Sequence, residues 1–303
     1  DKGKIATGIL DVQTADFTVL KASAQSVSDP VITVYNHLLS NGKQITVGKD
    51  GGVFADGEVI AVSKGEKLDA TDFTTDAANQ AQNIYTMNLD DYTVIAKKLN
   101  SKPIQILKGD AQLYTTDTYA EAFQWIQTNG DGGEYTVKIL VPRNYGTTDR
   151  DALMQVTTAK ASKITLEAAD GANIDNGYMR MRAASELTTL EMHDQVKMEL
   201  KNISVRRSNA EGLTDEQIIF VNNSSELTIG ANYKTVGDKA DIYGGSSTTD
   251  STKDTTVIVN GGIFQNVYGG SMEPHSHSGK SYITVGSGAT VTTIDGASKG
   301  EKQ

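Results

Sequence analysis

Two tyrosines occupy equivalent positions in neighbouring copies of a repeated phrase, and stacked aromatic rings of this kind can bind sugars. Tyr243 lies in residues 242–246 (Ile-Tyr-Gly-Gly-Ser), and Tyr268 lies in residues 267–271 (Val-Tyr-Gly-Gly-Ser). Side chains alternate between the two faces of a strand, so inward-pointing aliphatic residues before these tyrosines would turn both rings outward. We therefore predict a glycan-binding pair at Tyr243 and Tyr268. The alternative is that the rings only cover their turn or pack against a loop.

Carboxylates and cations that could cleave a polysaccharide are present, but their spacing matches no catalytic motif. The one Asp-Asp pair, Asp90-Asp91, falls in the first third of the chain. A lyase would need carboxylates that hold Ca²⁺ beside a basic residue. The residues available for such a cluster are Asp170, Asp175, Asp194, Arg180 and Arg182. Because their spacing does not bring them together, we predict no catalytic residues.

The sequence offers no convincing metal site and no cofactor motif. His275 and His277 point to the same side of an extended strand, but only Glu273 lies nearby as a third ligand, so we interpret the segment as a solvated loop. The acidic residues Asp69, Asp72 and Asp76 lack the ligand spacing of an EF-hand, and we interpret them as helix N-caps and solubilising residues. We therefore predict neither metal nor cofactor.

Composition excludes several classes of partner. The 303 residues include 28 Lys and Arg against 38 Asp and Glu, which gives a net charge of −10. An acidic chain without a basic stripe is a poor ligand for nucleic acids and anionic membranes. Cysteine is absent, which excludes disulfides and thiol chemistry. No window is long and apolar enough to predict a transmembrane segment.

The repeated phrase also predicts the architecture. A third, degenerate copy (Ile-Asp-Gly-Ala-Ser) lies at residues 294–298, and runs rich in Val, Ile and Thr at 256–259 and 282–285 separate the copies. Short strands and Gly/Asn/Ser corners at this period are typical of a β-solenoid, in which each turn buries the apolar side of its neighbours.

The rest of the chain is predicted to form two further parts. Frequent turn signals between short apolar runs predict a small β-sandwich-like domain over residues 1–115. Thr118 and Glu121 have the spacing of a capping box, which predicts a helix at about 118–129 that caps the core of the following solenoid. The fold class predicted is all-β, with the β-helix over residues 116–303.

Residues 119–298 resemble the pectin-lyase-like repeats of bacterial surface proteins, which form a right-handed, single-stranded parallel β-helix. The phrases at 260–263 (Asn-Gly-Gly-Ile) and 266–271 (Asn-Val-Tyr-Gly-Gly-Ser) resemble repeats of adhesin-like proteins from gut bacteria, and residues 3–35 resemble the first β domain of lipid-anchored surface proteins. The resemblance implies an exported, secreted or outer-membrane-anchored protein on the extracellular face. It also implies a lipidated cysteine upstream of Asp1.

We therefore expect a non-enzymatic, structural or adhesin-like surface protein that contacts host, dietary or cell-surface glycans, or other envelope proteins. Two alternatives stay open. One is a polysaccharide lyase or glycoside hydrolase that acts on uronic-acid-rich glycans along the β-helix face. The other is a purely architectural module without a ligand.

Overall fold

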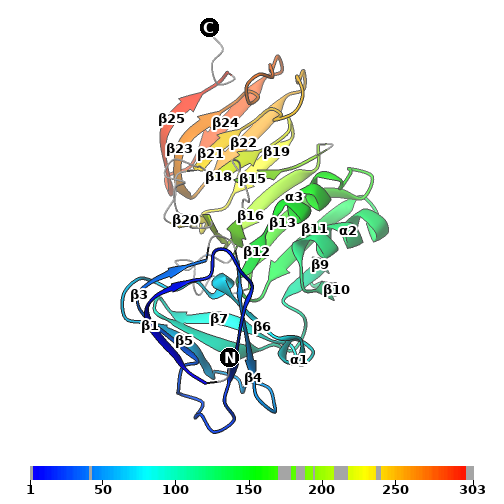
Figure 1. Ribbon diagram of the computed structural model, residues 1–303. Coiled ribbons are helices and arrows are strands. Elements are labelled where there is room, and N and C mark those ends of the chain that lie inside the picture. The colour runs from blue at the N-terminus through cyan, green and yellow to red at the C-terminus, as the bar shows by residue number, and fades with distance from the viewer. Residues whose placement is uncertain are drawn as a thin grey trace. The chain divides into compact units, whose positions relative to one another are not determined.

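The computed structural model describes residues 3–40, 43–169, 179–181, 188–193, 195–207, 218–236 and 240–297. The chain divides into two compact units, each of which can be followed by colour in Figure 1. The first unit holds residues up to Pro103 and also residues 141–144, and the second begins at Ile104. Strand β12 (Arg143–Tyr145) lies where the chain leaves residues 141–144 for the second unit.

Two sheets make up the first unit. The larger has the strand order β1 (Ile5–Asp11), β3 (Ile32–Leu39), β5 (Val59–Ser63), β8 (Thr93–Lys98) and β7 (Ile84–Asp90). The smaller has the order β2 (Phe17–Lys21), β4 (Ile45–Lys49) and β6 (Phe73–Thr75).

Strands β1 to β6 alternate between these sheets, and within each sheet they pair in parallel. Phe17 lies opposite Ile45, and Ile45 lies opposite Phe73. The N-terminal half of the unit is therefore itself a short solenoid, which ends in the antiparallel pair β7 and β8. The expected sandwich is not confirmed, because strands β1 to β6 follow one another in parallel turns. Gly57 has a φ of +78° but leads into β5 without a preceding partner strand.

Asp69 and Asp76 cap short helices, as predicted, whereas Asp72 is buried and accepts a hydrogen bond from the Ser40 hydroxyl. Asp69 accepts a hydrogen bond from the N–H of Thr71 at the start of η1 (Ala70–Asp72). Asp76 accepts one from the N–H of Asn79 in α1 (Ala77–Gln80). Both carboxylates satisfy amides that a helix start would otherwise leave unpaired.

The second unit is a parallel β-solenoid, and together the two units contain about 9 turns. Its longest sheet has the order β10 (Ala111–Thr116), β9 (Ile104–Lys108), β11 (Gly133–Ile139), β13 (Ala161–Ala168), β16 (Lys197–Lys201), β19 (Glu226–Ile229), β22 (Thr255–Val259) and β24 (Ser281–Val285). We call this the long sheet. Apart from the antiparallel β9 and β10, its strands pair in parallel.

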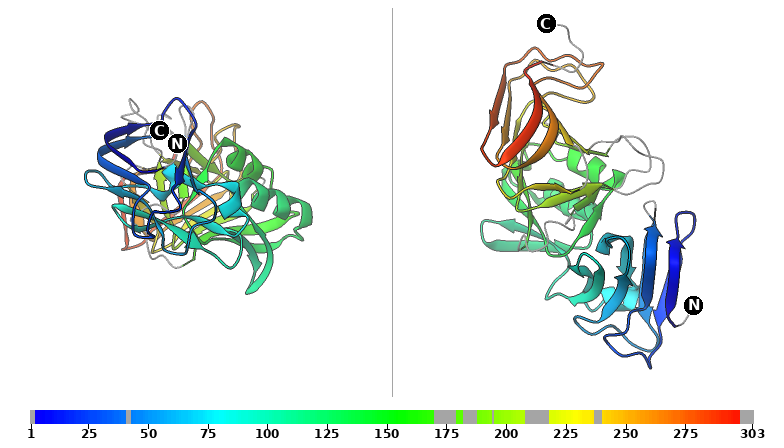
Figure 2. Two further views of the ribbon diagram at one scale, coloured as in Figure 1. Left: turned by 60° about the horizontal axis from the view of Figure 1, so that its bottom comes forward. Right: turned by 90° about the vertical axis from the view of Figure 1, so that its left-hand side faces the viewer.

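Two further sheets complete the turns of the second unit. We call one the corner sheet, with the order β15 (Thr188–Glu191), β18 (Ile218–Val221), β21 (Ala240–Tyr243), β23 (Gly262–Tyr268) and β25 (Ala289–Asp295). The third sheet includes β14 (Met179–Met181), β17 (Ser204–Arg207) and β20 (Lys234–Val236). The last strands of the corner sheet, β21, β23 and β25, lie side by side towards the red end of the chain in Figure 2. The predicted parallel β-solenoid is confirmed, and its right hand stays a prediction.

Columns of aliphatic side chains run along the core from turn to turn. Each residue of a column is the parallel partner of the next, and the side chains are fully buried until the final turn. The column of the long sheet consists of Val137, Leu166, Leu200, Ile229, Val259 and Val285. The column of the corner sheet consists of Leu190, Phe220, Ile242, Val267 and Ile294.

The helix predicted at 118–129 is present as α2 (Tyr119–Asn129). The hydroxyl of Thr118 accepts a hydrogen bond from the N–H of Glu121 at 3.2 Å, while the Glu121 carboxylate accepts one from the Thr116 hydroxyl rather than from the N-cap amide. Phe123 and Ile126 are fully buried in the same core cluster as the first parallel strand, as are residues of α3 (Thr147–Met154). That α2 caps the core of the solenoid stays a prediction. The backbone edge of β11, the first parallel strand, is covered by β9 and not by this helix.

A buried charge cluster links two turns of the first unit. Lys21 and Lys49 are parallel partners, and both ammonium groups contact the Glu58 carboxylate, at 2.9 Å and 3.0 Å. The Lys21 and Glu58 side chains are fully buried, whereas that of Lys49 is 21% exposed. Burial alone would raise the pKa of Glu58, but Lys21, the Ala55 N–H and Lys49 together hold this pKa below its ordinary value of 4.5.

We expect Glu58→Gln to lower the free energy of unfolding by about 3 kcal/mol, because it leaves the buried Lys21 ammonium without a counter-charge. Adding Lys21→Met should recover much of this loss, since no uncompensated buried charge remains. Since the folded-state pKa is lowered, Glu58 contributes stability above pH 4.5 that is lost as the pH falls through its folded pKa, and the variant should lack this dependence. Urea unfolding at several pH values measures both effects.

The matched control is Asp56→Asn in the exposed pair with Lys97, where the side chains are 52% and 39% exposed. It should cost at most about 1 kcal/mol. An equal loss for Asp56→Asn and Glu58→Gln would contradict the proposed role of the buried cluster.

Candidate functional site

The tyrosine pair forms the predicted stack but lies deeper than expected. Tyr243 and Tyr268 are parallel partners on β21 and β23, and their ring centroids lie 4.9 Å apart with planes 23° from parallel. Tyr243 is only 3% exposed, because it packs with Ile219 and Val221 on the outer face of the corner sheet. Tyr268 is partly exposed and packs against this cluster. Of these two tyrosines, Tyr268 is the one whose ring a ligand can reach.

Burial also sets the ionisation of both phenols. It raises the pKa of Tyr243 well above its ordinary value, and the nearby carboxylate of Asp241 adds to the shift. The same two causes raise the pKa of Tyr268. Asp241 is itself buried and accepts hydrogen bonds from the backbone and side-chain N–H groups of Asn266, at 3.1 Å and 2.9 Å. Both rings are thus neutral over the physiological pH range.

Glu191 lies in the same outward column, one turn before Val221. It is 3% exposed, and one carboxylate oxygen accepts a hydrogen bond from the Ser247 hydroxyl at 2.5 Å. Its other oxygen is buried and has no hydrogen-bond partner among the residues that the structure describes. Burial raises the pKa of Glu191, and hydrogen bonding to Ser247 opposes the shift only in part. This contact holds the start of the segment that follows β21 against the corner sheet.

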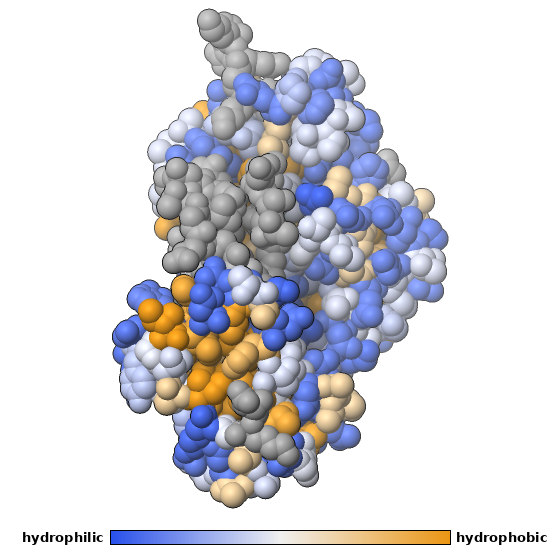
Figure 3. Space-filling view, viewed as in Figure 1, coloured by the Kyte–Doolittle hydropathy of each residue, from blue (hydrophilic) through white to orange (hydrophobic). Residues whose placement is uncertain are grey.

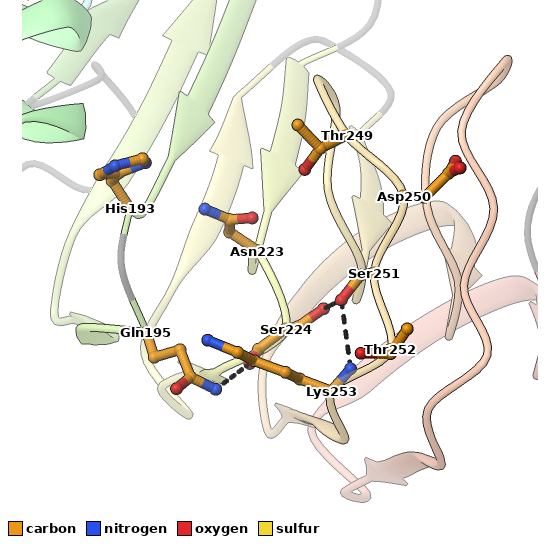
Figure 4. Close-up of a pocket in the computed structure, with 9 residues that line it drawn as sticks. All are labelled: His193, Gln195, Asn223, Ser224, Thr249, Asp250, Ser251, Thr252 and Lys253. Atoms are coloured by element: carbon orange, nitrogen blue, oxygen red, sulfur yellow. Dashed lines mark hydrogen bonds between the residues drawn. The ribbon is translucent and has the colours of Figure 1, made fainter.

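A pocket forms where the connections from the corner sheet to the long sheet change length. In successive turns these connections run over residues 192–196, 222–225, 244–254 and 269–280. The two longer loops extend beyond the shorter corners, and the first of them borders a pocket of about 260 Å³ over those corners. We call it the corner pocket, and it is lined by His193, Gln195, Asn223, Ser224, Thr249, Asp250, Ser251, Thr252 and Lys253 (Figure 4).

Hydrogen bonds between turns fix the floor of the corner pocket. The Gln195 side-chain amide donates to the Ser224 carbonyl at 3.2 Å, and the Ser224 and Ser251 hydroxyls hydrogen-bond to each other. Gln195, Asn223 and Ser224 all have positive φ, at 62°, 53° and 56°. Such values are uncommon for residues other than glycine and often mark functional sites. They turn backbone and side-chain polar groups towards the pocket at two successive corners.

Asp250 and Lys253, which line the corner pocket, differ in their contacts with other residues. Asp250 points away from the other lining residues in Figure 4 and accepts a hydrogen bond from the Ser276 N–H at 2.8 Å in the next loop. That bond lowers the pKa of Asp250, with a smaller contribution from His275. Lys253 forms no ion pair within the described part of the chain, and its side chain extends towards Gln195 in Figure 4. Its ammonium group is thus available to a ligand.

The other candidate residues do not form a site in the described structure. No group of three or more His, Asp or Glu side chains suited to a metal occurs among the described residues, and the loop with Glu273, His275 and His277 includes no such group. Asp91 forms an ion pair with Lys67 at 2.6 Å in the first unit. The residues considered for a lyase site lie outside the described residues, or have side chains that do: Asp170, Asp175, Asp194, Arg180 and Arg182.

The structure also shows an aromatic pair that the sequence analysis missed. Tyr114 on the edge strand β10 stacks on Trp125 of α2, with ring centroids 5.6 Å apart and planes 13° from parallel. Trp125 is partly buried against the core, while Tyr114 is 40% exposed. The contact joins a hairpin and a helix, so no spacing rule within one element would have indicated it.

No protein-family model, no curated protein and no solved structure matches this chain. Among the described residues, none of the helices has both the length and the apolar character that a bilayer crossing requires.

We expect Glu191→Gln to raise the free energy of unfolding at pH 7, because the amide keeps an acceptor for Ser247 and removes a buried charge. The folded-state pKa of Glu191 is raised, so its favourable contribution is complete below about pH 4.5 and is lost as the pH rises through the folded pKa. The gain of the variant over the parent should therefore shrink towards pH 4. Chemical denaturation across this pH range measures it.

Glu226→Gln is the matched control, since Glu226 forms an exposed ion pair with Lys197 at 3.0 Å. Its effect should stay within about 1 kcal/mol and be unfavourable at pH 7. A loss of stability at pH 7 in Glu191→Gln would show that the buried carboxylate is better solvated than its surroundings indicate.

Proposed function

We propose that this protein is a non-enzymatic, adhesin-like surface protein that binds glycans through the corner pocket. The observation that carries the proposal is the lining of that pocket, in which hydroxyl, amide and ammonium groups from three successive turns converge. Saccharides present dense hydroxyl groups, and a pocket lined by donors and acceptors on a rigid scaffold suits them. The partly exposed ring of Tyr268 provides a second candidate contact for a longer chain.

The chemistry of the lining supports binding rather than cleavage. Glycoside hydrolysis commonly uses a pair of carboxyl groups on either side of the scissile bond. Among the lining residues that the structure describes, the carboxylate is that of Asp250, and it accepts a hydrogen bond from the Ser276 N–H. Lys253 adds a positive charge without an acid partner among the described residues. We infer that the ligand is held and not cut, and that acidic sugars bind more tightly than neutral ones.

A location on the outside of a bacterial cell is part of the same proposal. An acidic chain with no cysteine and a β-solenoid that relies on turn-to-turn packing suits an exported protein. The solenoid would display the corner loops to host, dietary or cell-surface glycans, or to other envelope proteins. A lipid anchor upstream of Asp1 would hold it at the membrane.

We expect immobilised glycans that contain uronic acids to retain the purified protein more strongly than neutral ones. Lys253→Gln and Thr249→Val should each weaken this binding about tenfold or more, since each removes a polar contact to the ligand. Tyr268→Ala tests the aromatic contact separately. Glycan-array screening followed by calorimetry on the best ligand measures these changes.

Lys197→Gln is the control, because Lys197 is exposed and lies outside the corner pocket. It should leave affinity unchanged apart from a small salt-dependent effect. Absence of glycan binding, or equal loss in Lys197→Gln and Lys253→Gln, would contradict the proposal. Release of reducing or unsaturated ends from the bound glycan would favour a hydrolase or lyase instead.

A further inference from the structure

A second pocket of the second unit has a volume of about 360 Å³. Its lining comes from three successive corners, at residues 231–234, 262–263 and 288–290, and we call it the ledge pocket. These corners follow the long-sheet strands β19, β22 and β24, whereas the corners that line the corner pocket precede β16, β19 and β22. The two pockets therefore lie at opposite ends of two strands that they share, β19 and β22.

The ledge pocket forms where the cross-section of the solenoid changes. Within the described ranges the third sheet ends at β20, and the next turn passes from β22 to β23 through two residues. Phe220, Tyr233 and Phe264 pack together in the core at this level, with ring centroids between 5.7 Å and 6.2 Å apart. Gly262 lies directly against the Tyr233 ring, where a Cβ atom would come within 2.6 Å of it. The floor of the pocket is therefore bare backbone that rests on an aromatic core.

Ile263 gives the ledge pocket an apolar wall, and polar groups also line it. The Ile263 side chain is 64% exposed, although most described residues on the visible face of the second unit are polar in Figure 3. Asn232 and Thr290 are exposed as well, and the Asn232 side-chain amide donates a hydrogen bond to the Asn202 side chain at 2.8 Å. Pockets of this volume that combine apolar walls with a few fixed polar groups suit small organic ligands. A sugar residue, with an apolar ring face and hydroxyl groups at its rim, has the matching chemistry.

The outer face of β19 and β22 connects the two pockets and carries little charge. Thr228, Thr256 and Ile258 are partly buried and point outwards, because the residues next to them in the strands are buried in the core. The charged residue on this face, Glu226, is paired with Lys197 at 3.0 Å. A flat surface of hydroxyl groups and an aliphatic side chain suits a ligand that is rich in hydroxyls.

Ion pairs cover the preceding turns of the long sheet instead. On β13 and β16, the Lys163 ammonium lies 2.6 Å from the Glu199 carboxylate, and the Lys201 ammonium lies 3.3 Å from the Glu167 carboxylate. A ligand laid over these strands would have to remove water from four charged groups, which costs free energy. The outer face of β19 and β22 is therefore the more favourable route between the two edges of the long sheet.

The distance between the pockets sets the length of a ligand that could occupy both. Ser224 lines the corner pocket and Ala231 lines the ledge pocket, on either side of β19. Their separation of seven positions (231 minus 224) corresponds to roughly 20 Å of extended backbone at about 3.3 Å per residue. One sugar residue is too short for this span, whereas an extended chain of several residues can cross it.

We propose that the ledge pocket is a second subsite for the glycan that the corner pocket binds, and that this glycan is an extended chain crossing the outer face of β19 and β22. The apolar face of one sugar residue packs on Ile263, and its hydroxyl groups meet Asn232 and Thr290. The second subsite rests on the proposed function, since the corner pocket must first hold a glycan. Once it does, the second contact is intramolecular, so two weak subsites together bind a long chain tightly.

Calorimetry with oligouronates of increasing length, prepared from polygalacturonate and from alginate, tests the second subsite on the full chain. The affinity of the parent should rise at least about tenfold over a narrow range of lengths, where the ligand first reaches both pockets. Ile263→Ser should remove most of this step and leave disaccharide binding unchanged, whereas Lys253→Gln should weaken binding at every length. Tyr268→Ala, on the corner sheet, should leave the step in place. Leu89→Ser, at a side chain that is 59% exposed on β7 of the first unit, is the matched control and should bind like the parent.

Three results would overturn the second subsite while leaving the corner pocket in place. The first is an affinity that rises only in proportion to length, because longer chains would then merely offer more copies of one short epitope. The second is a step that survives in Ile263→Ser, and the third is a step that Leu89→Ser removes equally. If neither series binds at any length, or if Lys253→Gln does not weaken binding, the proposed function is contradicted and the second subsite with it.

Discussion

Each turn of this protein completes the core of the turn before it, and the rest of the structure depends on that stacking. The column from Val137 to Val259 is fully buried although each turn contributes only one of its residues. A single turn cannot bury enough apolar surface to fold, so stability accumulates through contacts between neighbours. The inward positions are therefore constrained to aliphatic or aromatic residues, while the corners between strands are free to change in length and composition.

This division explains where the candidate site lies. The connections at 192–196 and 222–225 are short, and those at 244–254 and 269–280 are long, yet the strands on either side keep the same register. The corner pocket follows from that change in loop length, and the hydrogen bond between Ser247 and Glu191 fixes the loop at 244–254 to the corner sheet. A rigid scaffold that carries variable loops is a common arrangement for binding sites. The polar residues of the pocket come from separate turns, and only the winding brings them together.

The sequence predicted the parts of the fold in which residues repeat visibly. The phrases at 242–246 and 267–271 indicated the solenoid, its parallel strands and the stacking of Tyr243 on Tyr268, because identical residues recur at the period of a turn. A β domain was predicted over residues 1–115, but its parallel turns were not, although Phe17-Thr18, Ile45-Thr46 and Phe73-Thr74 recur at the register that the strands adopt. The turn residues between them suit hairpins and solenoid corners equally well, so turn chemistry alone favoured a sandwich. The burial of Tyr243 and the corner pocket depend on loops from other turns, which no local pattern encodes.

The buried charged residues of the two units show under which conditions the stacked turns tolerate a charge. Lys21 and Lys49 share an inward column, where two like charges one turn apart are tolerated only because Glu58 reaches both from a corner. Glu191 is in the opposite situation, as a buried carboxylate that accepts a hydrogen bond from the Ser247 hydroxyl and has no ion pair among the described residues, so burial outweighs the weaker effects of Arg150 and His193 and raises its pKa. Buried charges stabilise a fold when they are paired and cost free energy when they are not. The first cluster therefore suits a structural role in joining turns, whereas the second lies beside a variable loop, where some stability can be given up for function.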